Sequence, residues 1–89
     1  MNKLDKLKLC RVCGFDHGDY TWGEDGTLAS FEICDCCGAE FGYYDCNLEA
    51  IRRNRKKWID GGANWSNPKI RPANWNLQIQ LQQIPEEYL

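Results

Sequence analysis

Two short segments with the pattern C-x-x-C-G, at residues 10–14 and 34–38, constrain this chain more than any other feature. Two cysteines at this spacing can turn both sulfurs onto one ion. The glycine that follows permits a positive φ, so that backbone N–H groups point at the sulfurs. Because spacing and glycine both occur twice, the pattern predicts a closed tetrahedral site of four thiolates, with the ligands Cys10, Cys13, Cys34 and Cys37.

The second segment contains a third cysteine, Cys36, which is the alternative to Cys37 as a ligand. We favour Cys37, because the spacing from Cys34 to Cys36 is too short for the usual turn and lacks the following glycine. Cys36 and Cys46 are expected to be small buried or half-exposed thiols. The only histidine, His17, could compete for the metal, but a hydrogen bond beside Asp16 in a loop is the simpler expectation.

A chain of 89 residues predicts a single domain, residues 1–89, whose small core needs an additional staple. A structural metal would provide one, since its binding free energy acts as folding free energy. The alternative is a disulfide framework. The first residues contain no uninterrupted apolar run typical of a signal peptide, and no later segment is long enough to span a membrane. We therefore expect a cytoplasmic protein, in which reduced cysteines hold metal.

The net charge of -2 conceals a strong segregation of charge along the chain. Residues 12–50 contain nine Asp and Glu and no Lys or Arg, whereas residues 51–60 contain five Lys and Arg and one Asp. Four thiolates around Zn²⁺ would add about two further negative charges to the acidic stretch. This stretch therefore has the wrong sign for binding phosphates.

The order of turn, hairpin and turn is typical of a zinc ribbon, which we expect at about residues 7–44. A short strand at residues 7–10 enters the first cysteine turn, and a β-hairpin joins residues 19–23 to 28–33 around Asp25-Gly26. The predicted fold class is small α+β: a metal-stapled zinc ribbon packed with one longer and one short C-terminal helix.

The helical part is expected at about residues 45–84. The longer helix covers residues 47–60, with Asp45 or Asn47 as its cap and Gly61-Gly62 at its end. A shorter helix begins after Asn76, near residues 77–84. In the longer helix one face is apolar, and Arg55 falls inside that face, so its side chain must reach water or meet an acid. The apolar face carries Leu48, Ile51, Trp58 and Ile59.

The second cysteine segment and the residues around it resemble the signature of the bacterial cysteine-rich CPCC-type proteins, which are small, zinc-ribbon-like chains. The run that carries the resemblance is FEICDCCGAEFGY at residues 31–43. Asp35 stands where those proteins usually have proline, so the turn is less stiff. The likeness covers roughly residues 10–84, with further matching positions at Lys57, Trp58, Ile59, Gly61, Trp65, Pro72, Trp75 and Leu81.

The resemblance implies a metal-stapled fold more firmly than a function. Some small bacterial proteins of this kind look like immunity proteins encoded beside toxin domains. Nuclease toxins carry basic surfaces, and an acidic inhibitor meets such a surface with fast, steered association. The leading hypothesis is therefore a non-enzymatic, zinc-binding protein-interaction module, with an acidic partner surface that includes Asp19, Glu24 and Asp25.

Two other functions are compatible with the sequence. The basic run at residues 52–57 could make the chain a nucleic-acid-binding zinc ribbon, although solvated bases that balance the acidic half are the simpler interpretation. Paired C-x-x-C-G turns also hold iron in rubredoxin-like electron-transfer sites, so iron is the alternative to zinc. The length and spacing around the cysteines fit rubredoxin less well, and we rank electron transfer last.

Overall fold

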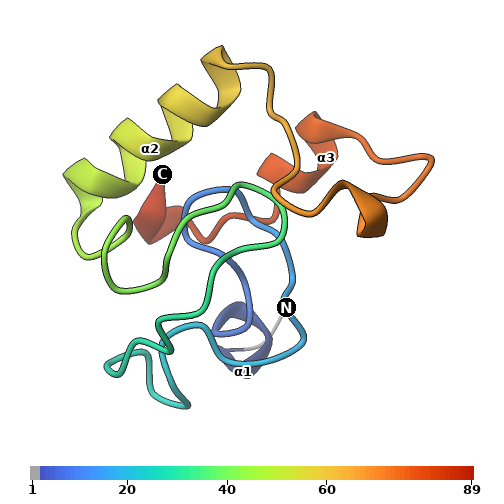
Figure 1. The fold of residues 1–89 in the computed structure, drawn as a ribbon. Coiled ribbons are helices and arrows are strands. Elements are labelled where there is room, and N and C mark those ends of the chain that lie inside the picture. Colours follow the sequence, from blue (N-terminus) through green and yellow to red (C-terminus); the bar gives the residue numbers. More distant parts are fainter. Residues whose placement is uncertain (1–2) are drawn as a thin grey trace.

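A computed structural model describes residues 3–89 of the chain (Figure 1). Long loops connect its few short helices, and the cysteine loops lie in the middle, with α2 on one side and α1 at the opposite end. None of the described helices combines the length and the apolar character needed to cross a bilayer. The elements are α1 (Lys3–Lys6), α2 (Leu48–Asp60), the 3-10 helix η1 (Pro68–Ile70), α3 (Leu77–Leu81) and the 3-10 helix η2 (Glu86–Tyr88).

The two C-x-x-C-G segments fold into the same turn. In the first, Cys10 N–H donates to the carbonyl of Phe15 at 2.8 Å, and Gly14 N–H donates back to Cys10 at 2.9 Å. In the second, the corresponding bonds join Cys34 to Ala39 at 2.9 Å and Gly38 to Cys34 at 3.0 Å. Both glycines have positive φ, 84° and 79°, as the sequence predicts. An isolated antiparallel bridge closes each turn, Leu9 to Asp16 and Ile33 to Glu40.

The predicted β-hairpin is not formed. These two bridges are the only strand-like pairing in residues 3–89, so the predicted strand at residues 7–10 reduces to Leu9 alone. Two hydrogen bonds join the expected arms, but the Thr21 N–H donates to the carbonyl of Leu7, which precedes the first cysteine turn, and not to the opposite arm. Phe31 has a φ of 61°, which interrupts extended backbone in the second arm. This part of the chain therefore consists of two cysteine turns joined by an irregular loop.

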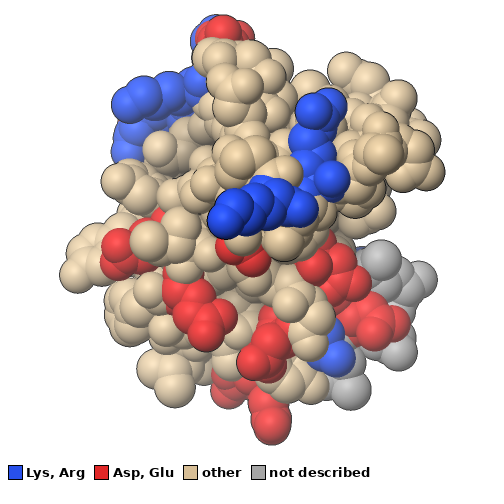
Figure 2. All heavy atoms as spheres, turned by 45° about the vertical axis from the view of Figure 1, so that its right-hand side comes forward, with Lys and Arg blue, Asp and Glu red and all other residues tan. Residues whose placement is uncertain are grey.

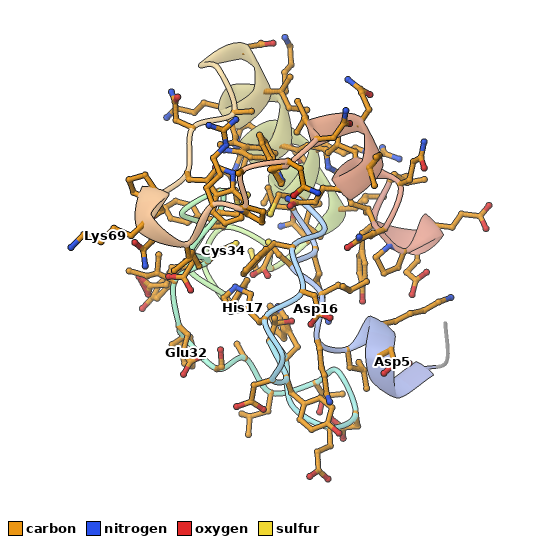
Figure 3. All side chains as sticks on the ribbon, turned by 90° about the vertical axis from the view of Figure 1, so that its right-hand side faces the viewer. Asp5, Asp16, His17, Glu32, Cys34 and Lys69 are labelled. Atoms are coloured by element: carbon orange, nitrogen blue, oxygen red, sulfur yellow. The ribbon has the colours of Figure 1, made fainter. Side chains whose placement is uncertain are left out.

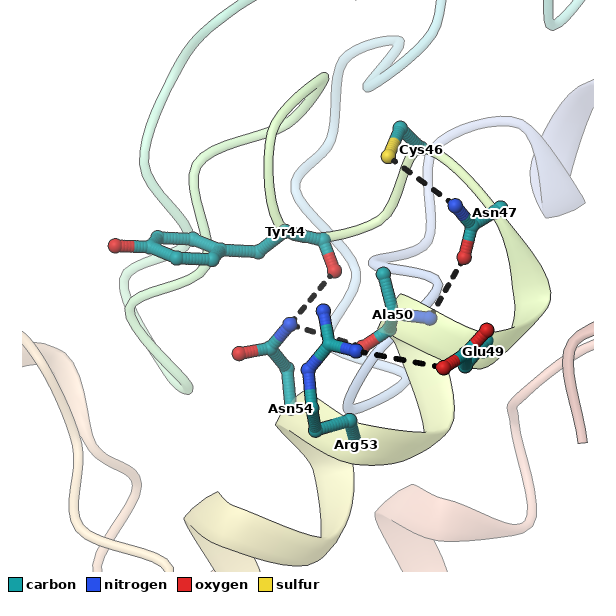
Figure 4. A network of polar contacts seen from close by, with 7 residues as sticks. All are labelled: Tyr44, Cys46, Asn47, Glu49, Ala50, Arg53 and Asn54. Atoms are coloured by element: carbon teal, nitrogen blue, oxygen red, sulfur yellow. Dashed lines mark hydrogen bonds and ion pairs between the residues drawn. The ribbon is translucent and has the colours of Figure 1, made fainter.

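The prediction of the longer helix is confirmed. Asn47 is the cap: its side chain accepts from Ala50 N–H at 2.8 Å, whereas Asp45 lies outside the helix (Figure 4). The helix ends where Gly62 adopts a φ of 107°. On the inner face Ala50 and Ile51 are buried, while Leu48 at the helix start is exposed. Burial of this face positions α2 against the cysteine turns.

Aromatic rings connect the cysteine turns to the C-terminal part. Successive ring centroids lie 4.9–6.4 Å apart, mostly edge to face, a geometry that stabilises each pair by about 1 kcal/mol beyond burial. The shorter helix, α3, is capped by the Asn76 side chain, which accepts from Ile79 N–H. α3 thereby begins where the sequence predicts. The row of rings runs Phe41, His17, Phe15, Trp65, Trp75 and Trp58.

Arg55 resolves its apolar position in a way that the sequence analysis did not foresee. Its guanidinium is partly buried and donates to three backbone carbonyls, those of Arg11, Val12 and Tyr88. Burial lowers the pKa of Arg55, but arginine still stays protonated in this setting. One cation therefore ties α2 both to the first cysteine turn and to the C-terminal segment.

We predict that Arg55→Met lowers the free energy of unfolding by about 3 kcal/mol, because three partly buried carbonyls lose a charged donor while the stem keeps its packing. Urea unfolding at fixed metal concentration measures the effect. Arg53→Met is the control on the same helix, since its 3.9 Å pair with Glu49 is exposed and contributes about 0.5 kcal/mol or less. Equal losses in the two variants would contradict the role assigned to Arg55.

Candidate metal centre

The two cysteine turns bring four sulfur atoms together, those of Cys10, Cys13, Cys34 and Cys37. All four lie within 4.8 Å of one another, and the pairs Cys10–Cys37 and Cys13–Cys34 are each 3.7 Å apart. Tetrahedral zinc with Zn–S bonds of about 2.3 Å requires sulfurs about 3.8 Å apart. A disulfide needs sulfurs at about 2.05 Å, so the sulfurs stand at metal-bridging and not at bonding distance. The group can hold a metal ion.

The electrostatics of the group also fit a cation. Burial raises the pKa of the Cys10 and Cys13 thiols well above the usual value. Hydrogen bonds from Cys10, Cys13 and Cys37 lower the pKa of Cys34 in turn. Four thiolates cannot coexist in this buried space without positive charge between them. A divalent ion would supply it, and the all-sulfur tetrahedral donor set suits zinc or iron.

Cys36 lies beside the four-sulfur group but is not one of its members, which include Cys37. The Cys36 side chain is buried in the same core cluster, interacts with the Cys13 side chain, and accepts from the Gln80 amide at 3.3 Å. Gln80 also donates to the carbonyl of Cys13 at 3.1 Å and accepts from the Trp75 indole at 2.8 Å. Cys36 is therefore buried as a small core thiol beside the centre. Cys46, by contrast, is exposed in the loop before α2.

His17 lies closer to the centre than the sequence analysis expected. Its ring packs edge to face between Phe15 and Phe41, next to Cys34 (Figure 3). Its Nε2 atom is buried and has no hydrogen-bond partner of acceptable geometry. Burial lowers the pKa of His17, but the close approach of the Cys34 sulfur, together with the negative charges of Cys34, Asp35 and Glu32, outweighs that effect and leaves the pKa raised. The imidazole thus presents a donor to the sulfur side of the centre without entering the set of four.

The centre is enclosed from several sides. Cys10, Cys13 and Cys34 are fully buried, and Cys37 alone is half-exposed. A cavity of about 270 Å³ borders Cys37 and is lined in part by Lys57 and Trp58 of α2. On the opposite side Gly14 leaves room for α3, since a Cβ there would lie 2.6 Å from the carbonyl oxygen of Gln80. Gly14 is therefore required twice: the turn needs its positive φ, and the packing of α3 needs the absence of a side chain.

Two parts of the site escaped the sequence analysis. The repeat is longer than C-x-x-C-G, because residues 10–18 and 34–42 both follow C-x-x-C-G-x-(D/E)-x-G. The acid in each copy, Asp16 or Glu40, is the bridge residue that closes the turn. This extended pattern was available in the sequence. Gln80, in contrast, is one of several glutamines in residues 77–84, and no sequence signal distinguishes it.

The chain is similar to two curated proteins of Bacillus subtilis (strain 168). It is 29% identical over 92 residues to the uncharacterized protein YozI, covering 78% of this chain and 70% of that protein. It is 28% identical over 91 residues to the uncharacterized protein YoaQ, covering 78% of this chain and 71% of that protein. No protein-family model and no solved structure matches. The resemblance to CPCC-type proteins therefore stays a prediction, and the function has to be argued from the site.

We predict that Cys37→Ser abolishes stoichiometric metal binding, because serine removes one of the four converging sulfurs. Cys36→Ser and Cys46→Ser should each retain one equivalent, since neither sulfur belongs to the group. Inductively coupled plasma mass spectrometry on the purified variants measures the metal-to-protein ratio. Retention of metal by Cys37→Ser with loss in Cys36→Ser would reverse the ligand assignment.

Proposed function

We propose that this chain is a non-enzymatic protein-binding module whose fold is held together by a structural zinc ion. The observation that carries the proposal is the convergence of four cysteine sulfurs within 4.8 Å at the junction of the two cysteine turns. Four thiolates fill every position of tetrahedral zinc and leave none for a water or a substrate. An all-sulfur site of this kind is typical of structural zinc and supports a scaffold function over catalysis.

The charge distribution supports binding to a basic partner. Acidic side chains gather on the lower part of the molecule in Figure 2, and the basic side chains lie mostly above them. The three residues expected at the partner surface, Asp19, Glu24 and Asp25, are all exposed. A surface of one sign accelerates the encounter with a partner of the opposite sign. Neutralising a basic toxin domain, as immunity proteins do, is the specific form of this function that we propose.

The arrangement of α2 gives less support to nucleic-acid binding. Several of its cations have partners within the protein: Arg55 binds three carbonyls, Arg52 donates to the carbonyl of Leu89, and Lys56 pairs with Asp60 at 2.6 Å. Bases committed in this way contribute less to phosphate binding than free ones. We therefore keep the protein-binding function as the proposal.

Removal of the metal tests the scaffold. We predict that a strong chelator unfolds the chain, with loss of the far-UV circular dichroism of α2 and of the thermal transition, because metal binding supplies folding free energy on the order of 10 kcal/mol. A colourless preparation with one equivalent of zinc is expected, whereas a red one would identify iron and a rubredoxin-like centre. An unchanged melt after complete removal of metal would contradict the structural role.

Reversal of charge tests the surface. A partner is first recovered by pull-down from the source organism and identified by mass spectrometry. We predict that combined replacement of Asp19, Glu24 and Asp25 by Lys lowers its association rate constant about tenfold at low salt, with little change in dissociation. Surface plasmon resonance measures both rates. Three acids elsewhere on the surface provide a control of equal charge change, and equal effects would remove this surface from consideration; they are Glu49, Asp60 and Glu86.

A further inference from the structure

Large apolar side chains are exposed in the middle of the acidic half. Leu28, Phe31 and Ile33 follow one another along one segment and are 72%, 57% and 57% exposed, and Tyr43 is 67% exposed. The ring centroids of Phe31 and Tyr43 lie 5.9 Å apart, so these two rings form one exposed surface. We call these four residues the apolar patch. Clustered apolar side chains left in water mark interaction sites more often than scattered ones.

The backbone at the apolar patch is strained. Phe31 has a φ of 61°, in the left-handed region that bulky residues avoid. Hydrogen bonds on both sides hold it there: Ser30 N–H donates to Thr21 at 3.1 Å, and Glu32 accepts from Phe41 N–H at 2.9 Å. Burial of the Phe31 ring does not offset this strain, because the ring stays exposed to water. Strain that persists without a folding benefit is typical of functional surfaces.

A glycine leaves the space that the exposed ring needs. A Cβ at Gly42 would lie 2.7 Å from Cε1 of Phe31 and 2.9 Å from Cβ of Ala29. Gly42 itself has a φ of 105°, and its N–H donates to the buried carboxylate of Asp45 at 2.7 Å. The second cysteine turn and the loop after it thus form a rigid platform under the Phe31 ring.

The charge around the apolar patch decides what can cover it. Glu32 is exposed between Phe31 and Ile33, and Figure 3 shows it pointing away from the body of the molecule. The whole of residues 12–50 has nine acids and no Lys or Arg. A second copy would bring like charges together at this surface, which opposes self-association. A partner with basic side chains around an apolar one matches both properties.

We infer that the apolar patch is the centre of the docking surface, and that its occupant is a protein segment that combines Lys or Arg with large apolar side chains. The inference rests on the protein-binding function proposed above and deepens it. The acids supply the attraction at long range, and the patch supplies the buried contact that slows dissociation. Phe31 is the residue expected to contribute most.

The test uses three fluorescein-labelled peptides and the full chain with its metal. The first, KWKLKWKL, combines bases with apolar residues. The second, KSKSKSKS, has the same charge without them, and the third, EWELEWEL, has the opposite charge. Fluorescence anisotropy gives the affinities, and ¹⁵N–¹H correlation spectra locate binding. We expect the first peptide to bind best, to shift amides at residues 28–33 and 42–44, and to weaken as salt screens the charges.

Two substitutions at the patch and one control complete the design. Phe31→Gly should weaken binding of the first peptide about tenfold. It should melt no lower than the parent chain, because glycine adopts this φ without penalty. Tyr43→Ser should weaken binding in the same direction. The control is Ile79→Ser on α3, a residue of similar exposure at 61%, which should leave the affinity unchanged.

The outcomes separate the inference from the function on which it rests. If the two basic peptides bind equally and Phe31→Gly has no effect, the apolar patch is not the centre of the docking surface. The proposed acidic surface would then bind its partner by charge alone. Equal binding of the acidic peptide, or equal loss in Ile79→Ser, would also overturn it. A dimer that Phe31→Gly dissociates would identify a second copy as the occupant instead. Binding of neither basic peptide would reject the inference together with the proposed acidic partner surface.

Discussion

Four sulfur atoms within 4.8 Å of one another set a condition that the rest of the molecule has to meet. Burial raises the pKa of the Cys10 and Cys13 thiols, and thiolates this close together would repel one another without a cation between them. With a divalent ion between them, the repulsion becomes the attraction that joins two turns lying twenty-four residues apart, at residues 10–14 and 34–38. No strand ladder performs this task, since only two isolated bridges occur in the described residues. The ion would thus replace both a sheet and much of a core.

The C-terminal half encloses the centre through contacts to backbone more than through apolar surface. Arg55 and Gln80 both donate to carbonyls of the first cysteine turn, one from α2 and one from α3. The aromatic row from Phe41 to Trp58 fills the space between them. Each of these carbonyl contacts joins a helix to the backbone of the same turn, so a metal ion that fixes this turn would also help to position α2 and α3.

The parts of the structure that the sequence predicts are those fixed by local chemistry. The C-x-x-C-G spacing predicts the turns and their positive-φ glycines, and Asn47 and Asn76 predict where the two helices begin. The β-hairpin failed because Asp-Gly between apolar runs describes the turn but not where the arms find partners. Thr21 instead bonds Leu7 and Leu9, which lead into the first cysteine turn, and no local pattern predicts this long-range pairing. For the same reason, nothing in the sequence distinguishes Gln80 or the carbonyl contacts of Arg55.

The absence of the expected hairpin also explains why the partner surface that we propose is centred on apolar side chains and not on Asp19, Glu24 and Asp25. A regular hairpin would alternate its side chains and bury every second one, so Phe31 and Ile33 would have been read as one packed face. The positive φ of Phe31 breaks that alternation and leaves the apolar residues of the arm in water. The acidic segment at residues 12–50 therefore also carries exposed apolar side chains, with the exposed Glu32 between Phe31 and Ile33. Charge of this kind governs how fast a partner arrives, whereas the buried apolar contact governs how long it stays.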